Sequence, residues 1–380
     1  MKLPYCLSTA GSQPIEKVGK VNGDGPRFFQ LYLPHDDELT ISLLTRAYNS
    51  GFDVCILTVD TWQLAWRHQD IKTANYAFYY GIGNELGWSD PIFQKRMQER
   101  GINPTTEPEK AGRMWIDSIW HGKAWTWSKL PWLIEQWKHI SNGRPFVLKG
   151  IQCVEDAQKA VEYGCDGIVV SNHAGRQVDG AVGSLDMLGE IVDAVGEKLT
   201  VLFDSGVRSG ADVFKAIALG AKAVCVGRLW IWGLSIDGEF GVRHVMKSLL
   251  ADFDILMNVA GYNSISEIDR KAIRMSFCEA EVNGRVHSMG KQLHSNEALK
   301  KVEVCLMNIK CPLAQKVHCR VYFECLFRNE RIYNFAFVWI FFNTCSSFKD
   351  SMIFPLTLNF PCMKRDLQIQ FRTLKQRRMG

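Results

Sequence analysis

The chain has 380 residues, 47% of them hydrophobic and 22% charged, which is typical of a globular protein with one large domain or two ordinary ones. Its net charge of +5 comes from residues 276–380, which carry 16 lysines and arginines against 8 acidic residues, whereas the first 275 residues carry 29 against 32. This distribution argues against a nucleic-acid partner, and the lack of any run of about 18 apolar residues excludes a transmembrane helix and a membrane partner.

The first 60 residues alternate between short apolar runs and amphipathic stretches. Pro4 and the polar residues after it interrupt any apolar leader, so we expect no signal peptide. Five scattered cysteines in the first 275 residues favour a reducing, intracellular setting, and we expect the protein in the cytoplasm. We expect strands at 3–8, 27–32 and 53–60 and helices at 12–19 and 36–49. In residues 61–144, which follow, apolar and polar residues alternate with no clear period.

Strand and helix patterns alternate at short intervals through residues 145–227. The expected strands are 145–149, 166–171, 199–204 and 223–227, the helices between them are 154–163, 185–195 and 209–219, and two closing helices are expected at 240–252 and 266–273. This alternation predicts a parallel sheet with helical crossovers, in the order of an α/β TIM barrel. A doubly wound open sheet is the alternative, but no Gly-x-Gly-x-x-Gly follows the first strand.

The stretch 171–177, Ser-Asn-His-Ala-Gly-Arg-Gln, directly follows the buried run 167–170. His173 and Arg176 would both lie at the carboxyl end of that strand, where barrels carry out their chemistry. A histidine can remove a proton near neutral pH, and an arginine can hold a carboxylate with two parallel hydrogen bonds. The pair indicates a substrate acid that is activated next to its carboxylate; a loop with a buried histidine and a surface arginine is the alternative.

Polar residues end every expected strand, as a single site at a barrel mouth requires. They are Ser8, Gln30 with Tyr32, Thr58 with Asp60, Lys149, Ser171 with His173, Asp204, and Gly227 with Arg228. Asp60 could hold His173 in one tautomer, or cap a loop. Lys149 could stabilise negative charge on an electron-accepting ring, or extend to solvent. Arg67 is a second cationic candidate, with a surface charge as the alternative.

Two glycine-containing turns with arginines follow the last two expected strands. They are Asp204-Ser205-Gly206-Val207-Arg208 and Gly227-Arg228. Glycine lets the backbone approach a phosphate, a helix beginning near Ser209 would supply N–H groups, and arginine supplies positive charge. Two ordinary turns are the alternative reading. No cysteine or histidine spacing in the chain indicates a metal site.

Taken together, these motifs resemble the FMN-dependent 2-hydroxy acid dehydrogenases and oxidases over about residues 3–273. The stretch 171–177 is similar to the active-site signature of that family, with Ala174 where glycine is commoner. The stretches 29–32, 58–61, 148–150 and 204–208 match other family motifs in the same order. The resemblance implies a TIM barrel, FMN as the cofactor, a small 2-hydroxy acid as the substrate, and oxygen or another acceptor for the electrons.

The resemblance also implies roles for individual residues. His173 would be the catalytic base and Asp60 would support it, while Tyr32, Arg67, His173 and Arg176 would contact the substrate. The residues expected to bind FMN are Ser8, Gln30, Thr58, Lys149, Ser171, Asp204, Ser205, Gly206, Val207, Arg208, Gly227 and Arg228. Members of the family commonly assemble as homotetramers, which we therefore expect here.

Within the family, the chain looks most like lactate 2-monooxygenase. The motifs that carry this likeness are 60–67, 90–95 and 120–127, together with the long segment 61–144. Such an enzyme oxidises lactate, retains the pyruvate while oxygen is reduced, and releases acetate after oxidative decarboxylation. A segment that slows product escape would favour that outcome. L-lactate oxidase or dehydrogenase activity shares the first half-reaction and is the alternative.

Two departures from the family bear on the domains. Residues 1–275 contain seven expected strands where a barrel closes with eight, so we expect a partial barrel that lacks the first strand. Residues 276–380 lose the resemblance, and we expect a divergent tail that is poorly ordered or not native to the protein. A truncated, inactive barrel without flavin is therefore the competing hypothesis from another functional class.

Overall fold

The computed structural model describes residues 3–74 and 76–273, and the backbone of four short strands within residues 319–369. The chain divides into two compact units, Met1–Ser276 and Phe277–Gly380. No helix in the described part of the chain is long and apolar enough to span a lipid bilayer.

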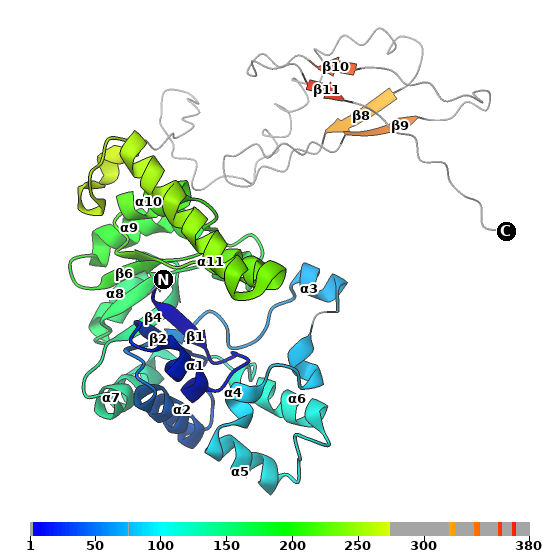
Figure 1. The fold of residues 1–380 in the computed structure, drawn as a ribbon, viewed down its shortest axis with the longest axis vertical. Coiled ribbons are helices and arrows are strands. Elements are labelled where there is room, and N and C mark those ends of the chain that lie inside the picture. Colours follow the sequence, from blue (N-terminus) through cyan, green and yellow to red (C-terminus); the bar gives the residue numbers. More distant parts are fainter. Residues whose placement is uncertain are drawn as a thin grey trace, which may run out of the picture. The chain divides into compact units, whose positions relative to one another are not determined.

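The first unit is built on one sheet of seven parallel strands that lie side by side in chain order (Figure 1). The strands are β1 (Tyr5–Ser8), β2 (Arg27–Leu31), β3 (Val54–Thr58), β4 (Phe146–Ile151), β5 (Gly167–Val170), β6 (Thr200–Phe203) and β7 (Ala223–Val224). Every neighbouring pair is parallel. Sequential parallel order is that of a barrel and differs from that of a doubly wound sheet, so the predicted barrel class is confirmed.

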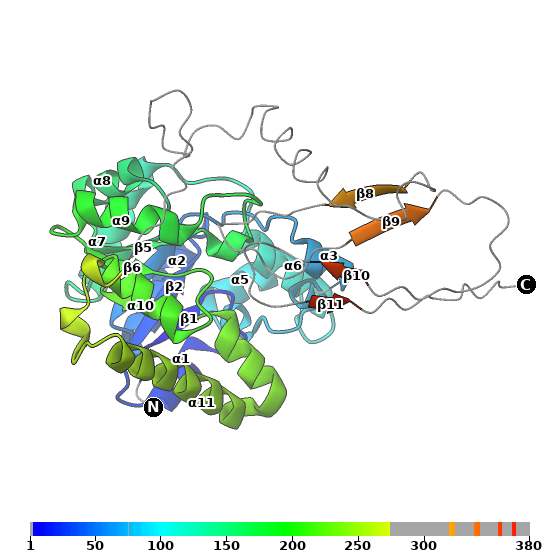
Figure 2. The same cartoon turned by 90° about the horizontal axis from the view of Figure 1, so that it is seen from above.

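Helices follow the strands and cover the outer face of the curled sheet (Figures 1 and 2). They are α1 (Ile15–Asn22), α2 (Asp37–Asn49), α7 (Leu130–Ile140), α8 (Val154–Glu162), α9 (Ser184–Val195), α10 (Gly210–Ala218) and α11 (Arg228–Val259). Buried residues of α1, α2 and α7 to α10 pack with the outward side chains of the strands in one large apolar cluster, whereas Phe253 of α11 packs with Phe214 of α10 in a smaller one. In the described residues, β1 and β7 each pair with one neighbour, so the barrel is partial.

The closing helices differ from the sequence prediction. The expected helix 240–252 lies within the much longer α11, which begins directly after β7 and contains a kink at Asp237 and Gly238. Gly238 has φ of 52°, a left-handed conformation that an α-helix does not contain. The expected helix 266–273 is wrong, because this stretch forms only two short 3₁₀ turns, Ile265–Glu267 and Arg270–Ala272.

The long segment without a clear period, 61–144, is helical where it is regular. Before α7 it contains α3 (His68–Lys72), η1 (Ala77–Tyr80), α4 (Glu85–Trp88), α5 (Pro91–Glu99), α6 (Pro108–Ile119) and η2 (Trp127–Lys129). Trp115 of α6 is fully buried and packs edge-on against Phe93, with ring centroids 5.1 Å apart. Gly87 is required beside this ring, because a Cβ atom there would lie 2.2 Å from it.

The side chains that point into the interior of the partial barrel locate the candidate site. One layer of apolar side chains fills it, from Ile56, Val147, Val169 and Leu202, which come from four successive strands. Side chains alternate across a sheet, so the residue two positions further along each strand points to the same side. Those residues, at the carboxyl ends of β3 to β6, are Thr58, Lys149, Ser171 and Asp204.

The second unit contains two antiparallel strand pairs in the part that the structure describes. They are β8 (Cys319–Phe323) with β9 (Val338–Phe342), and β10 (Leu356–Leu358) with β11 (Leu367–Ile369). The rest of the predicted divergent tail lies outside the described residues.

Candidate active site

A row of hydrogen bonds crosses the carboxyl ends of the first three strands. The Ser8 hydroxyl donates to Gln30 Oε1 at 2.7 Å, and Gln30 Nε2 donates to the Thr58 hydroxyl at 2.9 Å. Gln30 and Thr58 are buried, each with 6% of its surface exposed. The structure therefore brings together three of the residues that the sequence assigned to the cofactor, at the floor of the barrel mouth.

Lys149 lies between two carboxylates. Its Nζ is 3.8 Å from Asp60 Oδ2 and 3.6 Å from Asp204 Oδ2, and all three side chains are less than one-fifth exposed. Burial alone lowers the pKa of Lys149, but Asp204 and Asp60 outweigh it, and the net pKa is raised. Gly150 has φ of 108°, and a Cβ atom there would lie 2.9 Å from the Asp60 side chain, so this close approach requires glycine.

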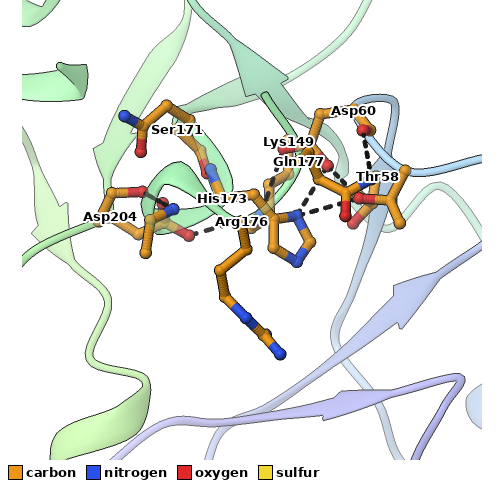
Figure 3. A network of polar contacts seen from close by, with 12 residues as sticks. Thr58, Asp60, Lys149, Ser171, His173, Arg176, Gln177 and Asp204 are labelled. Atoms are coloured by element: carbon orange, nitrogen blue, oxygen red, sulfur yellow. Dashed lines mark hydrogen bonds and ion pairs between the residues drawn. The ribbon is translucent and has the colours of Figure 1, made fainter. Parts of the chain in front are cut away.

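His173 is held by Asp60 across the mouth (Figure 3). His173 Nδ1 lies 2.8 Å from Asp60 Oδ1 and 3.1 Å from the Thr61 hydroxyl, which itself donates to Asp60 Oδ1 at 2.6 Å. With Nδ1–H donating to Asp60, the Nε2 lone pair is available to accept a proton. The His173 side chain is 14% exposed, so this nitrogen lies in a sheltered position.

The pKa values of this pair suit a base. Burial lowers the pKa of His173, and its hydrogen bond to Asp60 offsets only part of that effect, so the imidazole is neutral at pH 7. Burial raises the pKa of Asp60, but the hydrogen bond from His173 and the charge of Lys149 lower it further than burial raises it. A neutral imidazole next to an ionised carboxylate can take up a proton and be stabilised once it is charged.

Two arginines lie beside His173. Arg67 Nη2 donates to Gln177 Oε1 at 2.9 Å, and Arg67 Nε donates to the carbonyl oxygen of Arg176 at 3.4 Å. Figure 3 shows the Arg176 side chain extending past the His173 ring, on the side away from Asp60. Burial and then the charge of Arg176 lower the pKa of Arg67, as expected for two close guanidinium groups. Such a pair can hold a carboxylate next to the base.

Tyr32 follows β2 and faces the same region. It is 7% exposed, and its ring packs edge-on against Trp120 with centroids 5.3 Å apart. Burial raises the pKa of Tyr32, so its hydroxyl stays protonated at pH 7. Trp120 also lines a cavity of about 590 Å³, whose other aromatic walls are Trp66, Tyr76 and Tyr79.

The turns after β5 and β6 are tied together. The Ala174 N–H donates to the Ser205 hydroxyl at 2.9 Å, and that hydroxyl donates to Asp204 Oδ1 at 2.7 Å. The Ser171 hydroxyl accepts from the backbone N–H of His173 at 3.1 Å. The hydroxyls of Ser171 and Ser205 thus fix the backbone around the base, while Asp204 contacts both Ser205 and Lys149.

The helix that was expected to offer its first N–H groups to a phosphate, α10, is capped by side chains of the chain itself. At the start of α10, the N–H groups of Arg208 and Ser209 donate to Asp212, and that of Gly210 donates to Asp252. A phosphate would therefore find these groups occupied. By contrast, α11 begins at Arg228 after Gly227, with no side-chain cap, and a Cβ atom at Gly227 or Gly206 would meet nothing within 4 Å.

Positive charge gathers at this opening. Burial and then the charges of Arg176 and Arg208 lower the pKa of Arg228, as nearby cations do. An open backbone surface at Gly206 and Gly227, flanked by Arg208 and Arg228, is suited to a phosphate group. The chemistry of these residues thus fits the phosphate of a nucleotide-like cofactor at the start of α11.

Sequence reasoning gave no role to three residues that the structure places in the site. Gln177 donates to the carbonyl oxygens of Asp60 and Gln63, at 3.2 and 2.9 Å, and Thr61 contacts both His173 and Asp60. Gln177 and Thr61 belong to the motifs 171–177 and 58–61, so their position beside predicted site residues could have identified them. Asp70 lies in the segment without a clear period, where no signal in the chain marks it.

Comparisons with known proteins agree with this geometry. The family model for FMN-dependent dehydrogenase matches residues 1–275. An FMN-dependent alpha-hydroxy acid dehydrogenase of Penicillium citrinum is 47% identical over 274 residues, which are 72% of this chain and 67% of the relative. The chain belongs to the FMN-dependent alpha-hydroxy acid dehydrogenase family. The family predicted from the sequence motifs is thereby confirmed, and FMN is the cofactor of that family.

Other relatives of this family member include oxidases. An L-lactate oxidase of Lysinibacillus sphaericus is 36% identical over 272 residues, covering 70% of this chain and 66% of the relative. The solved structure of a lactate oxidase of Pediococcus acidilactici is 33% identical with a TM-score of 0.56, covering 70% of this chain and 65% of that one. A mandelate oxidase structure is 34% identical with a TM-score of 0.54. The chain spans about two thirds of the length of these relatives.

Replacing Ala174 by glycine is expected to stabilise this family member. Ala174 has φ of 56° and ψ of 38°, a left-handed conformation that costs about 1–2 kcal/mol for a residue with a Cβ atom. Glycine removes that strain but adds entropy to the unfolded chain, so we expect a net gain of about 0.5–1 kcal/mol in the free energy of unfolding. Urea unfolding measures it, and Ala181→Gly, a loop alanine without positive φ, should instead lower the free energy.

The stability of the chain is expected to be highest between about pH 6.5 and 9, because burial raises the pKa of the Cys6, Cys165 and Cys225 thiols from 9.0 to about 12, and their contribution is lost as pH rises from 9 through the raised pKa. The folded pKa of His173 lies below its usual 6.5 and that of Asp60 below its usual 3.8, so both contributions are present above those values and are lost as pH falls through the lowered pKa. The folded pKa of Lys149 lies above its usual 10.5, so its contribution is lost as pH rises through the raised pKa.

Urea midpoints measured from pH 4 to 11 test this profile. His35 and His121 also have lowered pKa values, so the acid limb of the wild type is a sum over three histidines. The difference between the wild type and His173→Gln isolates the contribution of His173, and it should shrink as the pH falls below about 6.5. A difference that is constant from pH 7.5 to 5 would contradict the assignment.

Proposed function

We propose that the protein oxidises a 2-hydroxy acid to the corresponding 2-oxo acid, with FMN as the first electron acceptor. The observation that carries the proposal is the hydrogen-bonded pair of Asp60 and His173, 2.8 Å apart, beside the two arginines of the barrel mouth. A base and a carboxylate clamp side by side are what this reaction requires of the protein. Membership in the family supports the same assignment.

The residues of the chain take distinct parts in the proposed reaction. Arg176 and Arg67 bind the substrate carboxylate, and the buried Tyr32 donates a hydrogen bond from its protonated hydroxyl. This binding places the substrate hydroxyl and Cα–H next to His173 Nε2, which takes up a proton. Asp60 then stabilises the imidazolium, because its carboxylate stays ionised within hydrogen-bond distance.

FMN, when bound, supplies the capacity to accept two electrons from the substrate carbon. The residues proposed to hold it are Ser8, Gln30 and Thr58 at the ends of β1 to β3, Lys149 at β4, Ser171 at β5, and the turns 204–208 and 227–228 after β6 and β7. Lys149 keeps its positive charge through Asp60 and Asp204 and can stabilise negative charge on the cofactor ring. Arg208 and Arg228 would hold the phosphate.

The finer substrate assignment is a small L-2-hydroxy acid such as lactate, with oxidative decarboxylation of the product. The motifs shared with lactate 2-monooxygenase and the helical segment 61–144, which contributes Arg67 and Asp70 to the site, support this choice. The relatives of the chain include lactate and mandelate oxidases, so mandelate, together with the smaller glycolate, belongs in the same substrate panel. Lactate oxidase or dehydrogenase activity without decarboxylation is the alternative within the family.

The visible spectrum of the purified chain tests the proposal in two steps. Addition of FMN should give a bound-flavin spectrum, and anaerobic L-lactate, glycolate or mandelate should then bleach it. Admission of oxygen, followed by assay of acetate against pyruvate, distinguishes the monooxygenase from the oxidase. A bound flavin that no 2-hydroxy acid bleaches would overturn the assignment.

A partial barrel that holds no flavin is the second candidate. The observation that favours it is the pair of open sheet edges, where Tyr5 is 37% exposed at β1 and β7 has two residues. Failure of FMN to bind would support this candidate.

Three further proposals accompany the enzyme assignment: a divergent tail after residue 275, a homotetramer and a cytoplasmic location. Light scattering of the purified chain tests the homotetramer.

A further inference from the structure

A carboxylate of the chain itself lies against the two arginines of the site. Asp70 Oδ2 is 3.6 Å from Arg176 Nη2 and 4.0 Å from Arg67 Nη1. Asp70 also acts on Arg228, whose pKa its charge raises against the effects of burial and two other arginines. The side chain of Asp70 is 31% exposed, so it faces the open side of the site rather than the protein interior.

The position of Asp70 is that of a substrate carboxylate in the proposed function. The Asp70 carboxylate and the substrate carboxylate would use the same guanidinium groups, those of Arg67 and Arg176. The two carboxylates would repel each other if they bound together. One must therefore leave when the other arrives. The element that carries Asp70 is α3, which has five residues, none of them buried, so its displacement exposes little apolar surface.

Arg67 does not depend on Asp70 for its position. Arg67 is held by Gln177 Oε1 at 2.9 Å and by the carbonyl oxygen of Arg176, and it is 16% exposed. Removal of the Asp70 charge thus leaves the Arg67 contacts intact. Asp70 is therefore not needed to orient Arg67, and the binding measurement on Asp70→Asn decides the same question for Arg176.

We propose that Asp70 is an internal competitor, a carboxylate on α3 that occupies Arg67 and Arg176 until the carboxylate of the ligand displaces it. The inference rests on the proposed function and adds a specificity device to the same site. The apparent affinity for a ligand is reduced by the fraction of molecules in which the arginines are occupied. A ligand without a carboxylate cannot displace Asp70, so α3 moves away only for acids.

Asp70→Asn is the direct test, because it keeps the side-chain volume and removes the charge. The probe is pyruvate, with binding followed by isothermal titration of the full chain. We expect the variant to bind pyruvate roughly 3- to 10-fold more tightly than the wild type, as removal of two partly exposed ion pairs predicts. Asp70→Glu keeps the charge and should bind close to the wild type. Asp117→Asn, which removes an exposed carboxylate from the nearby cavity wall, is the matched control and should change nothing.

Limited proteolysis gives a second readout that does not depend on catalysis. Lys72 is an exposed trypsin site within α3. Cleavage after Lys72, followed by mass spectrometry, should be slow in the free wild type and several-fold faster with pyruvate. In Asp70→Asn it should be fast without pyruvate. The thermal transition of each variant checks that it is folded.

The outcomes separate this inference from the proposed function, with Arg176→Met as the reference for binding at the site. If the wild type binds pyruvate through Arg176 and Asp70→Asn binds no tighter, the inference is overturned and the proposed function stands. Weaker binding by Asp70→Asn would show that Asp70 positions the arginines and would also overturn it. If neither protein binds pyruvate through Arg176, both fall. Tighter binding together with faster cleavage supports displacement.

Discussion

Replacement of His173 by glutamine is expected to lower kcat of the FMN-loaded protein by about 10²- to 10⁴-fold, the usual contribution of a positioned base. Of the two ring nitrogens of His173, Nδ1 is engaged by Asp60 and Thr61 and Nε2 is left to act as the base, and glutamine has no group that can accept a proton at pH 7. The glutamine amide can still donate a hydrogen bond to Asp60. The variant should therefore keep its fold while losing the chemical step.

Steady-state kinetics with the best substrate of the panel measure this effect, and the split between kcat and KM identifies its origin. KM should change little, because Arg67 and Arg176 would still bind the carboxylate. His139→Gln changes an exposed histidine of α7 and should leave both constants as in the wild type. If His173→Gln retained more than a tenth of kcat, another group would have to be the base.

Replacement of Lys149 by methionine is expected to lower the free energy of unfolding by about 3 kcal/mol at pH 7, the low end of the cost of removing one partner of a buried ion pair. The Asp60 and Asp204 carboxylates, 14% and 18% exposed, would lose the cation that lies between them. Asp60 Oδ2 is buried and has no hydrogen-bond partner among the described residues, so Lys149 is its main compensation. The Asp60–His173 pair should be weakened at the same time.

A double-mutant cycle decides whether charge or packing causes the loss. Adding Asp204→Asn to Lys149→Met removes one of the two stranded carboxylates and should restore part of the lost stability. Acidification should narrow the gap between Lys149→Met and the wild type, because protonated carboxylates no longer need the lysine. Equal losses in the single and double variants, at pH 7 and at pH 5, would instead assign the effect to packing.

Much of the fold was accessible from the sequence because parallel strands between helices are buried on both sides. Val-Cys-Ile-Leu-Thr at β3 and Gly-Ile-Val-Val at β5 are short β-branched runs that fit little else. Prediction was wrong at the end of the barrel. There the pattern of α11 breaks at Asp237 and Gly238, while the helix itself continues past the kink. Helix propensity summed over a short stretch of residues does not predict a helix that continues after a two-residue kink.

Chemistry at strand ends was also accessible, because residue type and position along a parallel strand determine which side chains reach the mouth. The sequence alone thus determined the fold class, the family and the set of polar residues at the carboxyl ends of the strands. Distances between residues far apart in the chain were decided only by the tertiary structure. It pairs His173 with Asp60 across 113 positions, places Lys149 between two carboxylates, and caps α10 with side chains while the start of α11 has no side-chain cap. It also brings Asp70 to Arg176, because curling of the sheet, and not any local pattern, sets which loops meet above the mouth.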